Sequence, residues 1–173
     1  QDAEWGLSMR IDSTIRYPWQ MTLGAIQDDS LIYQMGLDVA EQCRRLGVQI
    51  NFAPVVDVNS NHKNPIINNR SFGENPYRVA QQSLAYMQGL QDGGVIACAK
   101  HFPGHGDTDS DSHKTLPTIH HSYERLDTVD LIPFKTLFEQ GLGSVMVAHL
   151  HIPILDDTDS LASTLSTNIV KDL

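Results

Sequence analysis

Short apolar stretches alternate with stretches of helical periodicity along most of this chain. Residues 95–99 and 144–148 are apolar on both faces, and residues 48–58 are rich in β-branched side chains and close on Asp57. Strands that are buried on both faces belong mainly to parallel sheets covered by helices. The alternation therefore predicts an α/β fold of parallel strands between helices, as in an α/β barrel or a doubly wound sheet.

Several stretches have the spacing of helices. The first follows Asp28-Asp29-Ser30, whose side chains suit a helix N-cap, and it stops at Gly47. A long polar loop over residues 59–76 then leads to the second, which stops at Gly93-Gly94. The predicted helices span residues 32–46, 77–92 and 123–140, the last interrupted at Pro133, and a further helix starts near Ser166.

The chain has 173 residues, and no linker, internal repeat or low-complexity tract divides it. One domain over residues 1–173 is therefore the simplest interpretation. An eight-stranded α/β barrel typically needs about 250 residues, so we expect the chain to supply part of one such barrel, truncated at both ends. Open strand edges should then make the isolated chain prone to aggregation and inactive.

Composition excludes some classes of partner. The net charge is −9 at pH 7, so the phosphate backbone of a nucleic acid would be repelled. No apolar run approaches the roughly 18 residues that suggest a membrane span. Cys43 and Cys98 lie in apolar stretches without metal-ligand spacing, which predicts buried free thiols. The compartment stays open between bacterial cytoplasm, periplasm and secretion, because a signal peptide would precede Gln1.

Titratable residues gather where the predicted strands end. Asp57 closes the first strand, Lys100 and His101 follow the second, and His149 follows the third. In parallel α/β folds the carboxyl ends of the strands share one edge, where loops build the active site. We therefore expect these side chains at one mouth.

The segment from Lys100 to His113 is dense in titratable side chains. Proline and glycines between positions 103 and 106 impose a defined turn. A defined turn favours a site with fixed side-chain orientations over a solvated surface loop. His101 and His105 have the spacing of a helical zinc pair, although the same proline and glycines oppose a helix. A metal-dependent hydrolase that uses His101, His105 and His113 is thus one alternative.

Asp111 and His113 suit proton transfer instead. A carboxylate near one imidazole nitrogen fixes the tautomer, so that the other nitrogen can give and take a proton near neutral pH. The Asp-x-His triplet alone is weak evidence, because in most proteins it is two solvated side chains. Arg70, in the long loop, offers donors that suit sugar hydroxyl or acetamido oxygens, but also an ordinary surface carboxylate.

Five motifs carry a family resemblance. They are Lys100-His101-Phe102-Pro103-Gly104-His105-Gly106 followed by Asp111-Ser112-His113, Asp2-Ala3-Glu4-Trp5-Gly6, Asn51-Phe52-Ala53-Pro54-Val55-Val56-Asp57, Arg70-Ser71-Phe72-Gly73 and Met146-Val147-Ala148-His149. Together they span nearly the whole chain and resemble glycoside hydrolase family 3, in its β-N-acetylglucosaminidase (β-N-acetylhexosaminidase) branch.

The resemblance implies a (β/α)₈ barrel that removes terminal non-reducing β-linked N-acetylglucosamine with retention, as from peptidoglycan fragments or chitooligosaccharides. His113, supported by Asp111, matches the acid/base catalyst of that branch. The nucleophilic Asp of the branch lies beyond the position of Leu173, and the resemblance implies no metal and no cofactor. The positions that match contacts to the terminal sugar are Asp2, Arg10, Arg70, Lys100 and His101.

Two differences and two further alternatives accompany this resemblance. Many relatives carry Gln and Gly where this chain has Ala3 and Trp5, which affects the shape of the sugar subsite. A non-catalytic sugar-binding relative is an alternative to the enzyme. A β-glucosidase of the same family is disfavoured, because the Asp111/His113 pair belongs to the glucosaminidase-like branch.

Overall fold

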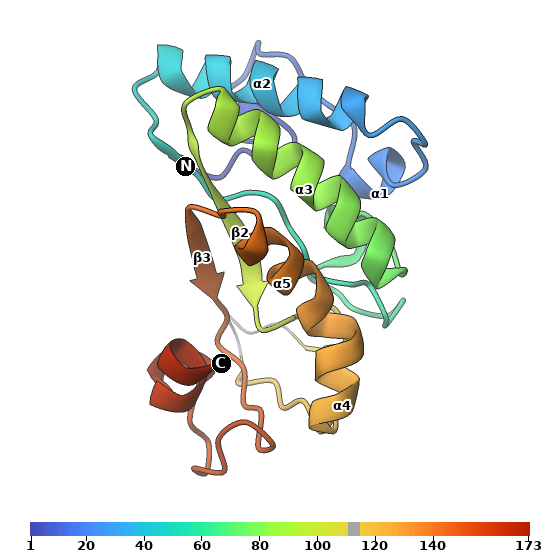
Figure 1. Ribbon diagram of the computed structural model, residues 1–173, viewed down its shortest axis with the longest axis vertical. Helices are drawn as coiled ribbons and strands as arrows, with labels where there is room; N and C mark the ends of the chain where they lie inside the picture. The colour runs from blue at the N-terminus through green and yellow to red at the C-terminus, as the bar shows by residue number, and fades with distance from the viewer. Residues whose placement is uncertain (111–114) are drawn as a thin grey trace.

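The computed structural model describes residues 1–110 and 115–173, and within them it forms a parallel α/β unit (Figure 1). Three strands, β1 (Ile50–Asn51), β2 (Ile96–Phe102) and β3 (Ser144–Val147), lie side by side in chain order. Both strand pairs are parallel, with Ile50 opposite Ile96 and Cys98 opposite Ser144. The α/β class expected from the alternating pattern is therefore observed in the described residues.

Helices connect and cover these strands. α3 and α5 lie over one face of the sheet, and α2 packs against α3 (Figure 1). The helices are α1 (Gln20–Leu23), α2 (Ser30–Arg45), α3 (Pro76–Asp92), α4 (Tyr123–Arg125) and α5 (Leu131–Glu139). Shorter turns are the 3₁₀ helices η1 (Leu7–Met9), η2 (Asn68–Arg70) and η4 (Ser163–Leu165), and the π-helical turns η3 (Leu126–Asp130) and η5 (Asn168–Asp172).

The two long helices form where the sequence predicts them, within two residues at each end. Pro76 opens α3, and the side chain of Asn75 caps it by accepting hydrogen bonds from the backbone N–H groups of Tyr77 and Arg78. α2 and α3 cross closely at two glycines: a Cβ on Gly36 would lie 2.9 Å from the Cα of Gly89. The glycines therefore set the distance between the two helices.

The strand predicted over residues 48–58 is too long, since only Ile50–Asn51 is regular. Beyond it the chain still follows β2, because the N–H of Cys98 donates to the carbonyl of Ala53 and the N–H of Val56 donates to the carbonyl of Lys100. Pro54 has no N–H to donate, so a regular ladder cannot run through it. The strand prediction over 95–99 is too short, since β2 continues to Phe102 and contains Lys100 and His101.

The interruption predicted at Pro133 lies earlier in the chain. Pro133 is inside α5, and the irregular turn is η3, which precedes it. A proline ring clashes with the carbonyl four residues before it in a regular α-helix. Here that residue is Val129, within η3, where the wider π turn takes the place of regular α-helical geometry.

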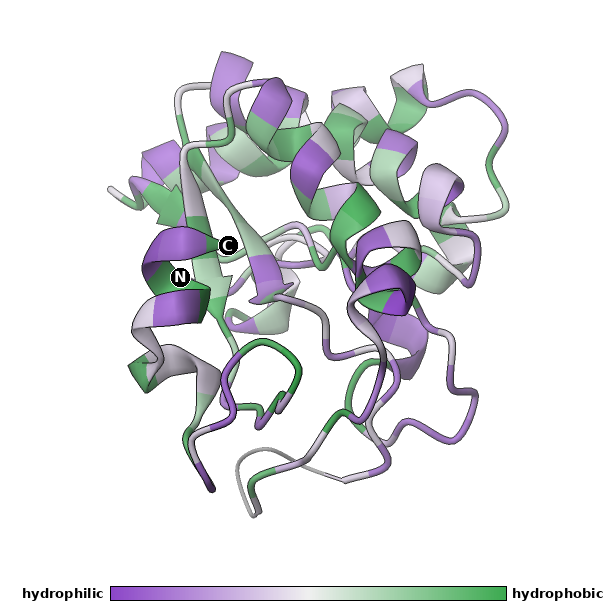
Figure 2. Ribbon diagram, turned by 60° about the horizontal axis from the view of Figure 1, so that its bottom comes forward, coloured by the Kyte–Doolittle hydropathy of each residue, from purple (hydrophilic) through white to green (hydrophobic). Residues whose placement is uncertain are grey.

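The main core fills the space between the helices and the sheet, with polar residues on the outer helix faces (Figure 2). Cys43 and Cys98 are buried and free, as expected. A smaller apolar cluster lies under the segment that follows β3 and contains Ile119, Leu126, Ala148, Leu150 and Ile152. No helix among the described residues is both long and apolar enough to span a membrane.

Candidate active site

A cavity of about 370 Å³ opens at the carboxyl end of β2. It is lined by Asp2, Glu4, Met9, Arg10, Phe52, Ile66, Arg70, Lys100, His101, His105 and Met146. The five residues assigned to sugar contact from the resemblance all line it, although they come from four separate parts of the chain. Their roles stay predictions, but the fold brings them to one place.

The N-terminal segment reaches the cavity because it runs alongside β1. Asn51 holds it, since its side chain accepts from the N–H of Ala3 at 3.0 Å and donates to the carbonyl of Ala3 at 3.3 Å. The terminal amine of Gln1 also donates to the carbonyl of Ile50. In an extended segment alternate side chains face the same side, so Asp2 and Glu4 both face the cavity.

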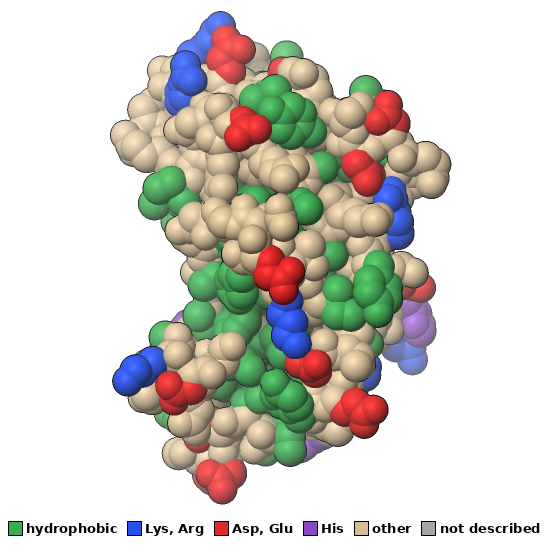
Figure 3. All heavy atoms as spheres, in the orientation of Figure 1, with side chains coloured by type: hydrophobic (Ala, Val, Ile, Leu, Met, Phe, Trp, Pro, Cys, Tyr) green, Lys and Arg blue, Asp and Glu red, His purple; other side chains and the backbone are tan. Residues whose placement is uncertain are grey.

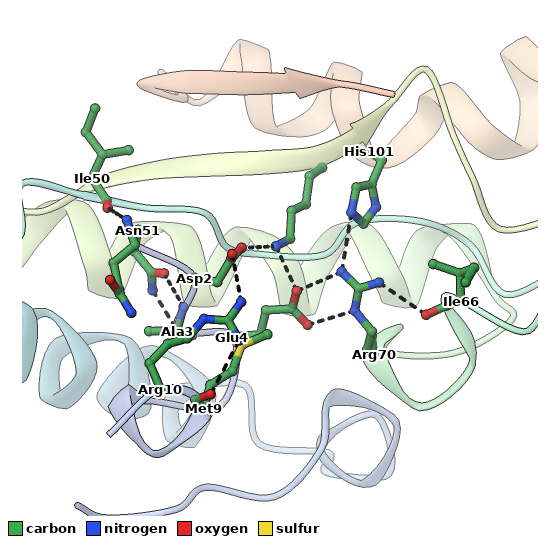
Figure 4. A network of polar contacts seen from close by, with 12 residues as sticks. Asp2, Ala3, Glu4, Met9, Arg10, Ile50, Asn51, Ile66, Arg70 and His101 are labelled. Carbon is green, nitrogen blue, oxygen red and sulfur yellow. Dashed lines mark hydrogen bonds and ion pairs between the residues drawn. The ribbon is translucent and has the colours of Figure 1, made fainter. Parts of the chain in front are cut away.

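Glu4 is the centre of the charge network, although it is not among the site residues predicted from the sequence. Its fully buried carboxylate accepts hydrogen bonds from Nε and Nη2 of Arg70 at 3.0 and 2.8 Å, and it pairs with Nζ of Lys100 at 2.7 Å (Figure 4). Burial raises the pKa of Glu4, but the hydrogen bond from Arg70 and the charges of Lys100 and Arg70 outweigh burial and hold that pKa below its ordinary value. Glu4 therefore fixes two cations that face the cavity.

Asp2 extends this network to the other side of Lys100. One carboxylate oxygen of Asp2 lies 2.9 Å from Nζ of Lys100, and the other lies 2.9 Å from Nη2 of Arg10 (Figure 4). Burial raises the pKa of Asp2, and the hydrogen bonds and charges of Lys100 and Arg10 reverse that effect, so the pKa is lowered. Lys100 is only 2% exposed, and its ammonium is held between Asp2 and Glu4.

Asp57 is a second buried carboxylate, directly behind the histidines. It accepts hydrogen bonds from the backbone N–H of His105 at 2.7 Å and of His101 at 3.2 Å, and its Oδ2 lies 2.6 Å from Nδ1 of His101. Burial raises the pKa of Asp57, but the charge and hydrogen bond of His101 outweigh burial, so the pKa is lowered. Asp57 thus orients the imidazole of His101 and the backbone turn that follows it.

The contacts of His101 hold its ring on both sides. Oδ2 of Asp57 lies 2.6 Å from Nδ1, and Nη2 of Arg70 lies 3.3 Å from Nε2. The carboxylate and the guanidinium therefore fix the orientation in which His101 faces the cavity.

His105 closes the turn next to His101. The side chain of Asn64 donates to the carbonyl of His105 at 2.7 Å, and Nδ1 of His105 lies 2.6 Å from the hydroxyl of Thr108. Burial lowers the pKa of His105, against the charge of Asp57. Gly106 is needed for space, because a Cβ there would lie 1.8 Å from the carbonyl oxygen of Val58.

Asp111 and His113, predicted as the proton-transfer pair, lie outside the described residues. His149 comes two residues after β3 and does not line this cavity; its Nδ1 lies 2.8 Å from the hydroxyl of Thr164. Over residues 1–110 and 115–173, no group of three or more His, Cys, Asp or Glu side chains has an arrangement that can hold a metal ion.

Several known proteins with similar sequences or structures are named as hexosaminidases or glycoside hydrolases. A family model described as the glycosyl hydrolase family 3 N-terminal domain matches residues 1–173. The chain is 39% identical over 163 residues to a beta-hexosaminidase A of Pseudoalteromonas piscicida, which covers 91% of this chain and 27% of that protein. A glycoside hydrolase family 3 β-N-acetylglucosaminidase from Paenibacillus sp. str. FPU-7 superposes with a TM-score of 0.93 at 40% identity, over 98% of this chain and 32% of that one.

NagZ from Neisseria gonorrhoeae, solved in complex with N-trifluoroacetyl-D-glucosamine, matches with a TM-score of 0.85 at 34% identity, over 94% of this chain and 49% of that one. The same protein has also been solved in complex with a zinc ion. The chain thus spans between 27% and 49% of the length of these relatives. Because the match to the Paenibacillus structure extends over nearly the whole chain, the barrel-type α/β class is confirmed. The chain belongs to glycosyl hydrolase family 3, whose N-terminal domain it matches from end to end.

Proposed function

We propose that the full-length protein containing this chain is an exo-acting β-N-acetylglucosaminidase. It hydrolyses terminal β-linked N-acetylglucosamine from glycans such as peptidoglycan fragments or chitooligosaccharides, with retention of configuration. The observation that carries the proposal is the cavity at the end of β2, where donors and acceptors fixed by buried ion pairs surround a space of about 370 Å³. The glucosamine derivative bound by the gonococcal relative supports the choice of sugar.

The charges around the cavity suit a neutral, hydroxyl-rich ligand. The cations there are already neutralised by carboxylates of the same network, so an anionic ligand gains little. A sugar hydroxyl can donate and accept hydrogen bonds, and an acetamido oxygen can accept them. Both can therefore use the hydrogen-bonding capacity that the same groups have left. The charged groups are Asp2 and Glu4, with Asp57 behind His101, against Arg10, Arg70 and Lys100.

In the proposed reaction, His113 gives and then takes the proton. Protonated His113 donates to the glycosidic oxygen while a carboxylate expected beyond Leu173 attacks the anomeric carbon and forms a glycosyl-enzyme. Neutral His113 then deprotonates the water that releases the sugar, and Asp111 holds the imidazole. Arg70, Lys100 and Asp2 hold the terminal sugar in place.

The test is the substitution His113→Ala in the full-length enzyme. Because general acid catalysis matters most for a poor leaving group, we expect kcat/KM to fall by about 10²- to 10⁴-fold on N-acetylglucosamine disaccharides. The loss on an aryl glycoside with an acidic phenol should be far smaller. His120→Ala, at an exposed neighbouring histidine, is the matched control and should leave both substrates unaffected. Equal losses on both substrates would contradict the assignment.

Two alternative functions predict other results. A metal-dependent hydrolase that uses His101, His105 and His113 would lose activity with a chelator and regain it with zinc, whereas the glycosidase should be indifferent to the chelator. A non-catalytic sugar-binding relative would bind N-acetylglucosamine but release none from any substrate.

A further inference from the structure

A second cluster of charged side chains lies next to the candidate site but does not line its cavity. Nε2 of His121 is 2.6 Å from Oδ2 of Asp107, and Nη1 of Arg125 is 2.6 Å from Oδ2 of Asp130. Both pairs border the turn after β2, since Gly104, three residues before Asp107, packs against Asp130. Together these four residues form the outer cluster, which the proposed mechanism does not use.

Asp130 anchors the outer cluster to the turn after β2. Its side chain is 4% exposed, although it is charged and lies at the end of the π turn η3. Gly104 packs directly against it, since a Cβ on Gly104 would lie 2.8 Å from the Cβ of Asp130. Burial raises the pKa of Asp130 to about 6, against the opposing charge of Arg125. Burying a carboxylate costs desolvation free energy, so the burial of Asp130 indicates a role other than packing.

The outer cluster joins the two limbs of the segment between β2 and α4. The outgoing limb follows β2, and the returning limb leads to α4. The outgoing limb is fixed on its other side, where Asp57 accepts from the N–H of His105 and Asn64 donates to the carbonyl of His105. The returning limb is paired with the chain after β3, because the N–H of Ile119 donates to the carbonyl of His151. The pair Asp107–His121 links one limb to the other across these supports. In the sequence, Asp111 and His113 lie between its two members.

We infer that Asp107, His121, Arg125 and Asp130 are positioning residues for proton transfer. They fix the described residues on both sides of the segment that carries Asp111 and His113. They do so from outside the cavity, so the sugar contacts made by Asp2, Arg70 and Lys100 do not depend on them. The inference rests on the proposed function for its effect on catalysis, but not for its effect on the segment.

The test replaces His121 in the full-length enzyme. A misplaced catalytic group costs up to about 100-fold in rate, so we expect His121→Ala to lower kcat on N-acetylglucosamine disaccharides by about 10- to 100-fold. The inhibition constant of free N-acetylglucosamine should change less than about twofold, since the cavity itself is intact. The loss should be much smaller on an activated aryl glycoside, and His121→Gln, which keeps a hydrogen bond to Asp107, should restore part of the rate. His120→Ala serves as the matched control.

A second measurement does not need the enzyme to be active. Hydrogen exchange of the amides at 108–110, 115–116 and 118–119 should become faster in His121→Ala and in Asp107→Asn, while exchange in α3 stays unchanged. Equal losses on both substrates, a parallel loss of N-acetylglucosamine affinity, or unchanged exchange would each overturn the inference. A wild-type protein without glycosidase activity would instead overturn the proposed function, and the exchange result would still decide whether the outer cluster holds the segment.

Discussion

Glu4 shows how a single buried carboxylate can organise a binding cavity. It is completely buried and accepts two hydrogen bonds from Arg70, while Lys100, on β2, pairs with it. Removing the carboxylate from a buried ion-pair network leaves the cations without a counter-charge. The resulting loss of folding free energy is larger than the net stabilisation that the ion pairs contribute. Glu4 therefore offsets the charges of Arg70 and Lys100 and holds both side chains in the orientation in which they face the cavity.

This role predicts the effect of Glu4→Gln. The substitution keeps the shape but removes the charge, so the buried Lys100 and the partly buried Arg70 lose their shared counter-ion. We expect the free energy of unfolding to fall by about 3 kcal/mol, measured by urea denaturation of the full-length protein. Glu41→Gln on α2 removes the carboxylate of an exposed ion pair with Arg45 and should change stability little. Similar losses in both variants would show that the burial of Glu4 contributes nothing.

Asp130 predicts a pH dependence of the opposite sign to that of most carboxylates. Its pKa is raised from 3.8 to about 6, mainly by burial, so between these pH values the folded protein holds a proton that the unfolded chain has released. Stability from this group is therefore full at low pH and falls as the pH rises through the window, by on the order of 3 kcal/mol in total. Asp130→Asn should remove this fall. Urea unfolding of both proteins from pH 4 to pH 7 measures it, and parallel curves would contradict it.

The sequence predicted which residues line the cavity better than it predicted the ion pairs between charged residues. The five residues assigned to sugar contact came from motif resemblance, and they meet because segments at the ends of parallel strands converge. Glu4 was not predicted as a site residue, although it lies within the motif Asp2-Ala3-Glu4-Trp5-Gly6. A signal was present, since Asp2 and Glu4 alternate along an extended segment and a lysine inside an apolar strand needs a buried counter-ion. The outer cluster has no such signal, because its members meet only through the fold.

At the scale of the elements, the deviations from the predicted pattern surround the site. The two long helices follow the apolar periodicity closely, because amphipathic spacing and caps are local features. Beyond β1, the chain near Pro54 departs from regular geometry where its backbone pairs with β2. The turn η3, before α5, departs from it where Asp130 is buried against Gly104. Local sequence could not show this, since tertiary contacts override local propensity there.

The turn after β2 predicts the effect of Gly106→Ala. A Cβ at this position would lie 1.8 Å from the carbonyl oxygen of Val58, which is backbone and cannot rotate away. The substitution should shift residues 104–108 and lower both the melting temperature and kcat of the full-length protein. Gly141→Asn is a suitable control, because space is open around Gly141 and Asn tolerates its positive φ of 80°. A Gly106→Ala variant with wild-type kcat would show that this close approach is unimportant.

At the scale of the whole molecule, the described sheet presents an open edge at β3. β3 has one described neighbour strand, β2, whereas the N-terminal segment borders the outer side of β1. Exposed apolar side chains lie on β3 and on the chain after it, among them Val145, Ile154 and Val170. Figure 3 shows hydrophobic side chains gathered in the hollow between the main body and the C-terminal segment. An open strand edge next to exposed apolar surface is a template for association with other chains.

The isolated 173-residue chain is therefore expected to associate rather than remain monomeric. Light scattering coupled to size-exclusion chromatography should show oligomers that grow with concentration, and N-acetylglucosaminidase assays of the same fractions should show no turnover, because the proposed nucleophile lies outside the chain. Val145→Lys, at an exposed position on the edge strand β3, should reduce association without restoring activity, since an edge lysine opposes strand pairing. A monomeric 173-residue chain would contradict the role of the open edge in association. Glycosidase activity of the same chain would contradict the placement of the nucleophile outside it.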